Sequence, residues 1–459
     1  VTSVDTVFFK GAVSADGANV SFVQLGHGGF DSDDDHGQYK DAAKDATGAQ
    51  PATTNDVGNS GDITVTVTAG DLEFLAGKDA DTYAQLGHGG RSTRDSHSGD
   101  ITVDVAGGIR FIASQDHGTG NTNPGGNERS YVQLGHGGND SDGTHSGDIS
   151  VTAGIFAAGP EAGRGIVFRG GDHLNTSAQI GHGGHGSKTY GTVAGGGAGL
   201  TGDITVAAEG DIHFVAGSYF KNGSPFDVGN EAQNYVQIGH GGYDVDAYQD
   251  GGRQLASGNV QGHSGDISVT TTMGNISFLA ANSGFDTHAG DNGGTYHYAQ
   301  VGHGGAFAQG DHNGSIEVRA GIDADGTVTD ATSQVLFAAG GGTTDDWADN
   351  NNYAQLGHGG RHDGNTANSS GNFGLVTDTI SVMSGDDITF TAAGGVNSYV
   401  QLGNGGYNAR GDHSANIQVF AEGDFTASAA QLAADGSTGS YTASYSFQLG
   451  ETDGNRHRN

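Results

Sequence analysis

The stretch Tyr83-Ala84-Gln85-Leu86-Gly87-His88-Gly89-Gly90 decides the fold, because close copies of it recur along the whole chain. Its central string, Gln-(Leu/Ile/Val)-Gly, occurs nine times at intervals of 46 to 63 residues. Self-similarity at such a spacing is the signature of a repeat architecture. The nine units are marked by Gln24, Gln85, Gln133, Gln179, Gln237, Gln300, Gln355, Gln401 and Gln448.

Each unit also contains two earlier apolar segments in a fixed order. In the unit of Gln85 they are residues 60–67 and 70–77. The first alternates Ile and Val with Thr and is preceded by Gly, a pattern typical of a strand of about five residues. No segment shows helical periodicity, so the sequence predicts an all-β protein without helices.

Three short strands cannot bury an apolar face alone, but stacked units can. Stacking at about 4.8 Å closes the hydrogen bonds between units and creates a continuous narrow core. The sequence therefore predicts a parallel β-solenoid as a single domain over residues 1–459, with eight to nine rungs of three strands. The crossover rule makes the coil right-handed. A nine-bladed propeller is the alternative, but blades need four strands and usually a Trp signature, and Trp347 is the single Trp.

The variable spacing indicates insertions after the Gly-Gly pair and between the second and third segments. Residues 30–59, 243–262 and 281–297 are examples. They are rich in Asp, Asn, Gly and Ser, which is typical of solvated loops.

The composition excludes several classes of partner. The chain of 459 residues holds 18 Lys+Arg against 53 Asp+Glu, a formal net charge of −35. Nucleic acid and anionic lipid need a cationic footprint, so neither is expected as a partner. The chain has no Cys, which excludes disulfides and thiolate chemistry. No apolar run reaches the ~20 residues of a membrane-spanning helix, so direct membrane insertion is not expected.

Stacking turns each repeated residue into a column, and the first column is histidine. It could be a metal-binding or pH-sensing file, since protonation below about pH 6.5 would place like charges some 5 Å apart. Alternatively, each ring nitrogen bonds the backbone of the Gly-rich turn, a role that the Asn404 of the eighth unit can share. The column comprises His27, His88, His136, His182, His240, His303 and His358.

The nine Gln residues that mark the units form a second column. Their amides are expected to hydrogen-bond to one another, as in the Gln ladders of cross-β stacks. An aromatic file, mostly Tyr, should share their face of the strand, either stacked between rungs or exposed to hold a sugar.

A third column is acidic. Stacked carboxylates repel unless each caps backbone amides or a cation intervenes. Replacement by Ser315, Thr379 and Asn416 in later units favours capping, because these residues also accept hydrogen bonds from turn amides. The column comprises Asp62, Asp100, Asp148, Asp203 and Asp266.

Several loops are rich in carboxylates and are candidate weak Ca²⁺ sites, the one cofactor that the sequence suggests. The tandem Gly-Gly-x-Gly-x-Asp repeat of dedicated calcium rolls is absent from the sequence. The candidate ligands are Asp31, Asp33, Asp34, Asp35, Asp140 and Asp142.

No catalytic site is predicted. The sequence has no Gly-x-Ser-x-Gly elbow, phosphate-binding loop or His-Glu-x-x-His motif. Every acid or base that stands out recurs in several units, whereas an active site is a unique constellation. A polysaccharide-binding or polysaccharide-degrading β-helix remains the alternative function.

The repeated strings Gly-Asp-Ile-x-Val, Asp-Ile-x-Phe-x-Ala-Gly and Tyr-Ala-Gln-Leu-Gly-His-Gly-Gly resemble repeat regions of large bacterial surface exoproteins of the filamentous haemagglutinin type. The resemblance spans almost the whole chain. It implies a right-handed β-helical rod at the bacterial cell surface, with adhesive or structural work and cell-surface glycans as candidate partners. It supplies no catalytic residues, and the secretion-recognition region of that family is not found here.

The two ends add an expectation about assembly. Residues 5–11 match the second segment of a unit, and residues 447–450 match the third. Uncapped rungs expose strand edges that invite pairing. The sequence therefore predicts an extracellular rod that is either a segment of a giant adhesin, continued by adjoining repeats, or a subunit that stacks end to end into a fibre.

Overall fold

The protein is described by a computed structural model, and every regular element in its described part is a β-strand. The structure describes residues 1–11, 21–30, 58–77, 81–93, 96–113, 129–141, 143–171, 175–187, 199–216, 233–245, 262–280, 296–340, 351–361, 373–393, 397–409, 411–429 and 446–449. These residues form 27 strands in three nine-stranded parallel sheets.

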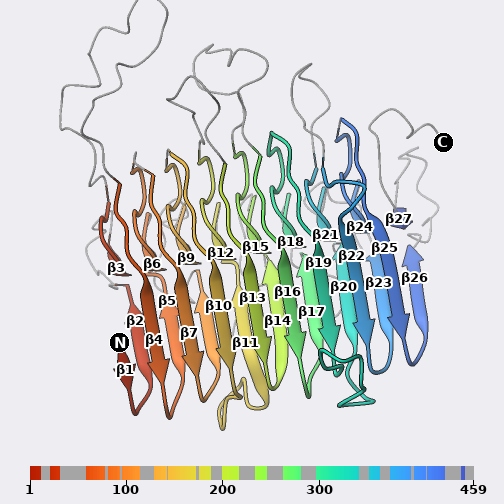
Figure 1. Ribbon diagram of the computed structural model, residues 1–459, viewed down its shortest axis with the longest axis horizontal. Helices are drawn as coiled ribbons and strands as arrows, with labels where there is room; N and C mark the ends of the chain where they lie inside the picture. The colour runs from red at the N-terminus through yellow and green to blue at the C-terminus, as the bar shows by residue number, and fades with distance from the viewer. Residues whose placement is uncertain are drawn as a thin grey trace, which may run out of the picture.

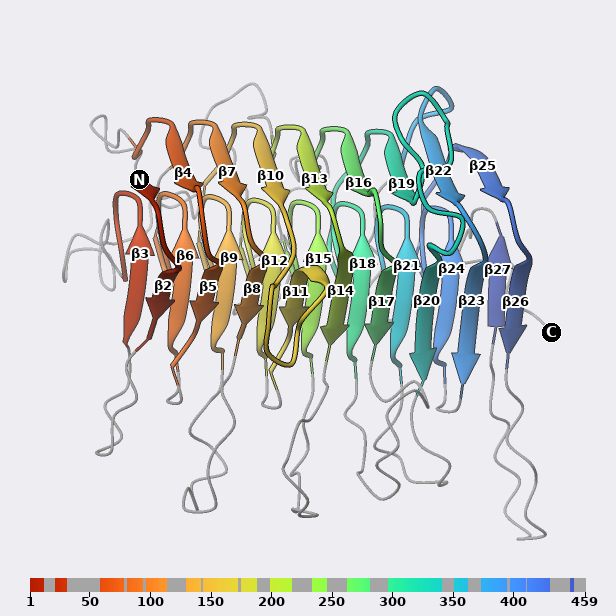
Figure 2. The ribbon, with the colours of Figure 1, turned by 90° about the horizontal axis from the view of Figure 1, so that it is seen from below.

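Successive strands fall into the three sheets in strict rotation, which makes nine rungs of three strands (Figures 1 and 2). Sheet A holds β1 (Thr2–Ser3), β4 (Ile63–Val67), β7 (Ile101–Val105), β10 (Ile149–Ala153), β13 (Ile204–Ala208), β16 (Ile267–Thr271), β19 (Ile316–Ala320), β22 (Thr379–Ser384) and β25 (Asn416–Ala421). Sheet B holds β2 (Val7–Lys10), β5 (Leu72–Leu75), β8 (Ile109–Ile112), β11 (Arg164–Arg169), β14 (Asp211–Ala216), β17 (Ile276–Ala280), β20 (Val335–Gly340), β23 (Ile388–Ala393) and β26 (Phe425–Ala429). Sheet C holds β3 (Phe22–Leu25), β6 (Tyr83–Leu86), β9 (Tyr131–Leu134), β12 (Ser177–Ile180), β15 (Tyr235–Ile238), β18 (Tyr298–Val301), β21 (Tyr353–Leu356), β24 (Tyr399–Leu402) and β27 (Ser446–Leu449).

The predicted fold is confirmed: the described chain is a right-handed parallel β-solenoid, with β1 and β25 at opposite ends of sheet A (Figure 1). Pairing is in register from rung to rung, so that Gln85 lies opposite Gln133 and Ile101 opposite Ile149. Identical residues are thereby placed directly above one another, as the sequence columns require.

The core follows from the alternation of side chains along sheets A and B. In β4, Ile63, Val65 and Val67 are buried while Thr64 is exposed. Phe74 and Phe111 lie face to face inside the solenoid with ring centroids 4.7 Å apart, and the file continues through Phe168. The interior is thus a stack of like residues, which gives each rung the same packing partners as the next.

Sheet C differs because both of its faces are buried. In β6, Ala84 and Leu86 point into the core, while Tyr83 and Gln85 belong to the opposite face and are also fully buried. The Gly-His-Gly-Gly segment folds back over that outer face, and the position of Gly90 is so close that a Cβ there would lie 3.0 Å from the Tyr83 hydroxyl. The glycines of the repeat thus allow a second backbone layer to lie directly on the sheet.

The insertions are more varied than predicted. Segments before and after sheet C contain most of the extra length, as expected from the sequence. Two further insertions join a strand of sheet A to the next strand of sheet B, at residues 154–163 and 321–334. The first contains buried Phe156 and Glu161, so it packs against the solenoid instead of projecting as a purely solvated loop.

Candidate functional site

The histidine column lies in the turn that leaves sheet C, where both ring nitrogens bond to the backbone. The Nδ1 atom of His136 accepts a hydrogen bond from the backbone N–H of His88 at 3.0 Å. Its Nε2 atom lies 2.8 Å from the carbonyl oxygen of Gly99. A backbone N–H can only donate and a carbonyl can only accept, so the ring is the neutral tautomer with its proton on Nε2.

The same pair of bonds repeats along the column, with neighbouring rings stacked 4.7 to 5.1 Å apart. Burial lowers the pKa of His182 to about 4 and that of His136 to about 2, the charge of His182 adding to the effect at His136. Burial also lowers the pKa of His240 and His303 well below the ordinary value. The buried members of the column are therefore neutral imidazoles at pH 7.

Asn404 occupies the position of a histidine in the eighth rung, and its hydrogen bonds can be compared with those of the imidazoles. Its Oδ1 accepts from the backbone N–H of His358 at 2.7 Å, in place of an imidazole Nδ1. Its Nδ2 donates to the carbonyl oxygen of Ser414 at 3.0 Å. The amide therefore bonds the N–H of the preceding rung as an imidazole does, and donates to a different backbone carbonyl. These contacts agree with the second alternative, in which this position bonds the backbone of the turn.

The glutamine column is continuous, but the predicted bonds between amides are wrong. The Nε2 of Gln179 donates to the carbonyl oxygens of Gly239 and Gly241 in the next rung, at 3.0 and 2.7 Å. Its Oε1 receives the hydroxyl of Tyr235 at 3.4 Å. Glycine carbonyls of the folded-back turn lie closer to each amide than the neighbouring amide does, so the column links sheet C to its outer layer.

The tyrosines beside the glutamines are stacked and buried. Tyr298 and Tyr353 have ring centroids 4.9 Å apart and an interplanar angle of 3°, and neither is exposed. Burial raises their pKa well above the ordinary value. This file therefore stacks between rungs, and the alternative of an exposed sugar-binding file does not hold for it.

The acidic column caps backbone amides, as predicted. The Oδ1 of Asp100 accepts from the backbone N–H of Asp148 at 2.9 Å, and that of Asp148 accepts from Asp203 at the same distance. Ser315 continues the series by accepting from the backbone N–H of Thr379 at 3.2 Å. A similar cap begins sheet B, where Asp71 accepts from Gly108.

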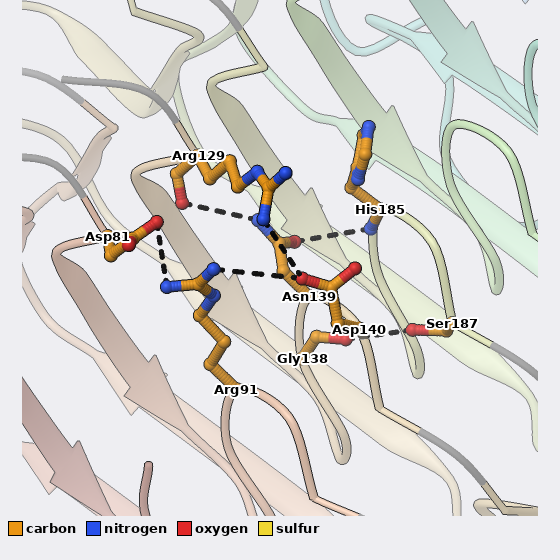
Figure 3. A network of polar contacts seen from close by, with 8 residues as sticks. All are labelled: Asp81, Arg91, Arg129, Gly138, Asn139, Asp140, His185 and Ser187. Atoms are coloured by element: carbon orange, nitrogen blue, oxygen red, sulfur yellow. Dashed lines mark hydrogen bonds and ion pairs between the residues drawn. The ribbon is translucent and has the colours of Figure 1, made fainter. Parts of the chain in front are cut away.

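Of the candidate calcium ligands, the structure describes only Asp140; Asp31, Asp33, Asp34, Asp35 and Asp142 lie outside the described residues. The carboxylate of Asp140 lies 3.8 Å from the guanidinium of Arg91 and 3.9 Å from that of Arg129 (Figure 3). The cations beside this carboxylate are therefore arginines. Among the described residues, no group of three or more His, Asp or Glu side chains is arranged to hold a metal ion.

A second histidine column was missed in the sequence. His97, His145, His263 and His312 begin the return toward sheet A, and all four are buried. The Nδ1 of His145 accepts from the backbone N–H of His97 at 3.2 Å. The sequence does contain a signal, since His-Ser-Gly-Asp-Ile occurs three times, but three of the eight positions are not histidine (Asn59, Leu200 and Phe373).

The second residue after each Gly-(His/Asn)-Gly string is not conserved between the rungs. This position, which we call the turn position, follows the marker Gln by six residues. Its side chains differ in chemistry from rung to rung, whereas the columns beneath them are nearly uniform. The turn positions are Phe30, Arg91, Asn139, His185, Tyr243, Ala306, Arg361 and Tyr407.

Non-repeating aromatic side chains gather at the C-terminal half of this row. The buried Tyr243 meets the ring of Phe307 edge-on at 5.2 Å, and Phe307 lies 5.9 Å from Tyr296. The guanidinium carbon of Arg361 lies 5.3 Å from the ring centroid of Tyr296 and 4.7 Å from that of Tyr407. On a scaffold whose other columns repeat, this cluster is a described feature with the character of a unique site.

Comparison with known proteins adds no relative: no family model, no curated protein and no solved structure matches this chain. Within the described residues, no helix is long and apolar enough to cross a membrane. The site must therefore be interpreted from its own geometry.

Proposed function

We propose that this chain is a structural rod of adhesin type that works outside the cell or at the bacterial surface, and that it has no catalytic role. The observation that supports the proposal is the state of the repeated polar side chains. His, Gln and Asp recur because each bonds the backbone of a neighbouring rung. Side chains engaged in this way hold the stack together, which supports a structural role for the repeat.

The rod is proposed to continue beyond these nine rungs, through adjoining repeats of a longer chain or through a second copy. The outermost strands of the described stack pair on one side only, with β3 and β27 at the two ends of sheet C. Their open edges offer backbone groups in the same parallel register that joins the rungs within the stack. The net charge of −35 would keep such rods apart laterally.

Electron microscopy of the purified chain, first with calcium and then with chelator, tests this proposal. Copies that stack should form uniform fibres one solenoid wide, and separate rods of about 40 Å indicate that adjoining repeats are needed. Loss of the fibres in chelator would support Ca²⁺ at the acidic loops. Particles without an elongated shape in either condition would contradict the rod.

A second function, the binding of a polysaccharide, is favoured by one specific observation. The partly exposed rings of Tyr296 and Tyr407 flank the guanidinium of Arg361, and the partly exposed ring of Phe307 lies beside that of Tyr296. Aromatic side chains with a polar edge are suited to ligands that are apolar on one face and hydroxylated at the rim. Binding of labelled oligosaccharides to the purified chain, compared with a variant that lacks Tyr407, tests this function.

A further inference from the structure

Arg91 and Arg361 occupy the same turn position in two different rungs. Each follows its marker Gln by six residues, and each is only 6 % exposed. The carbonyl of Arg361 accepts a hydrogen bond from the backbone N–H of Phe307 in the preceding rung at 2.8 Å. At this shared position of the rung, the two arginines differ in their side-chain neighbours.

Arg91 is paired with carboxylates from two positions. Asp81, four residues before the marker Gln of the same rung, lies 2.7 Å from Nη1. Asp140, seven residues after the marker Gln of the next rung, lies 3.8 Å from Nη2. Figure 3 shows both contacts. This arrangement satisfies a nearly buried cation with anionic acceptors, as such a cation requires.

Both carboxylates are missing around Arg361. The residue four before its marker Gln is Asn351, and the residue seven after the next marker is Asn408. The Oδ1 of Asn351 already accepts from Asn397 at 3.1 Å. No described residue accepts a hydrogen bond from Nε or Nη1 of Arg361, and both atoms are buried.

A buried guanidinium without an acceptor is costly, because it loses hydration and gains no hydrogen bond in return. Here it is held between the rings of Tyr296 and Tyr407, which lie on opposite sides of it along the rod axis and are themselves partly exposed. Cation–π contacts of this kind stabilise the charge but leave the N–H groups unbonded. Within the described residues these two nitrogens therefore lack an acceptor, and an anionic group of a ligand would supply one.

We propose that Arg361 is the anion-binding centre of a site for an acidic sugar residue, whose carboxylate takes the place that Asp81 and Asp140 hold beside Arg91. Carboxylate matches the planar guanidinium fork. The tyrosine rings supply flat faces for a pyranose ring. The amides of Asn351 and Asn408 supply donors and acceptors for hydroxyls. Because Nε and Nη1 are buried, the carboxylate enters as one of the flanking tyrosine rings turns outward.

This inference rests on the polysaccharide-binding function proposed above and is independent of rod assembly. Isothermal titration of the full chain with a galacturonate trisaccharide tests it, with the neutral galactose trisaccharide and a tri-glutamate peptide as comparisons. Arg361→Gln should weaken galacturonate binding at least tenfold, because a charge-assisted bidentate contact is lost. Arg91→Gln is the matched control at the equivalent position and should leave the affinity unchanged.

Asn351→Asp provides a second variant that keeps the arginine. The new carboxylate should pair with Arg361 as Asp81 pairs with Arg91, which should block the ligand at least tenfold and raise Tm. The proposal is overturned if the intact chain does not bind the galacturonate, if Arg361→Gln or Asn351→Asp binds it as well as the intact chain does, or if the tri-glutamate peptide binds as tightly. Electron microscopy of the same samples reports rod assembly separately, so failure of this site and failure of the rod are distinguishable.

Discussion

Each buried histidine of the first column is a neutral link between the backbone of its own rung and that of the preceding rung. His182 accepts from the N–H of His136 and contacts the carbonyl of Gly147 at 2.9 Å. Its own N–H donates to the next imidazole, that of His240. The residue type is selected by the positions of two backbone groups, and this explains why Asn404 can replace it.

The first prediction concerns this link. His182→Ala removes both ring contacts and leaves a buried N–H and a buried carbonyl without partners. We expect a loss of about 2–5 kcal/mol in the free energy of unfolding. His182→Asn should cost less, because the amide can accept from the same N–H as Asn404 does. Chemical denaturation of the two variants measures the difference; an Asn variant as unstable as the Ala variant would contradict the link.

At the scale of the element, glycine allows the outer layer to lie on sheet C. Gly181 has φ +150°, and a Cβ at this position would overlap the carbonyl oxygen of Gly239 in the next rung. Gly61 has a similar φ of +131°, yet a Cβ there would meet nothing within 4 Å. Substitution of Gly61 therefore tests the cost of the positive φ alone, whereas substitution of Gly181 adds the clash with the next rung.

The second prediction uses this pair. Gly61→Ala should cost about 1–3 kcal/mol from the unfavourable φ alone. Gly181→Ala should cost more, because the turn must also move away from the next rung. Thermal unfolding of the two variants provides the comparison. Equal effects would show that the close approach is unimportant.

The third prediction concerns the histidine column as a unit. Its buried members are neutral in the folded state, and their pKa lies below the ordinary 6.5. Below that pH the unfolded chain binds more protons than the folded chain, so stability is complete above about pH 6.5 and falls as the pH falls toward the lowered pKa values. Each histidine contributes a slope of about 1.4 kcal/mol per pH unit. The six column members with a lowered pKa, which are all but His27, therefore give about 8 kcal/mol per pH unit.

We therefore expect steep, cooperative acid unfolding within about two pH units below 6.5, given stabilities of 5–15 kcal/mol for folded proteins. Circular dichroism along a pH titration measures it. A chain that stays folded at pH 4 would show that the imidazoles are not the neutral, doubly bonded groups described here.

Some features of the strands could be predicted from the sequence, and others could not. The strands of all three sheets and their register could be predicted, because each Gln, His and Ile repeats at one position of the rung. The buried outer face of sheet C could not, because Tyr83 and Gln85 alternate like the exposed face of an ordinary strand. The pairing of Arg91 with Asp81 and Asp140 depends on that outer layer. The sequence alone therefore could not predict that Arg91 has carboxylate partners and that Arg361 lacks them.

At the scale of the whole molecule, the protein combines uniform columns with one non-repeating row. The columns make the rungs interchangeable, and the turn positions give each rung its own surface. Repeat proteins of this kind gain stability from neighbouring rungs and recognition from residues outside the repeat. The proposed rod depends on the repeated columns, and the proposed sugar site depends on the turn positions.

The central claim is that each unit is one interchangeable rung of a structural rod. Deleting residues 133–178 joins Val132 to Gln179 and removes one full unit while the register of sheet C is kept. Cryo-electron microscopy should then count eight rungs in the shortened chain against nine in the whole chain, at the same spacing of about 4.8 Å. An unfolded or rearranged product would contradict the claim, because it would show that the deleted unit holds something that its neighbours cannot replace.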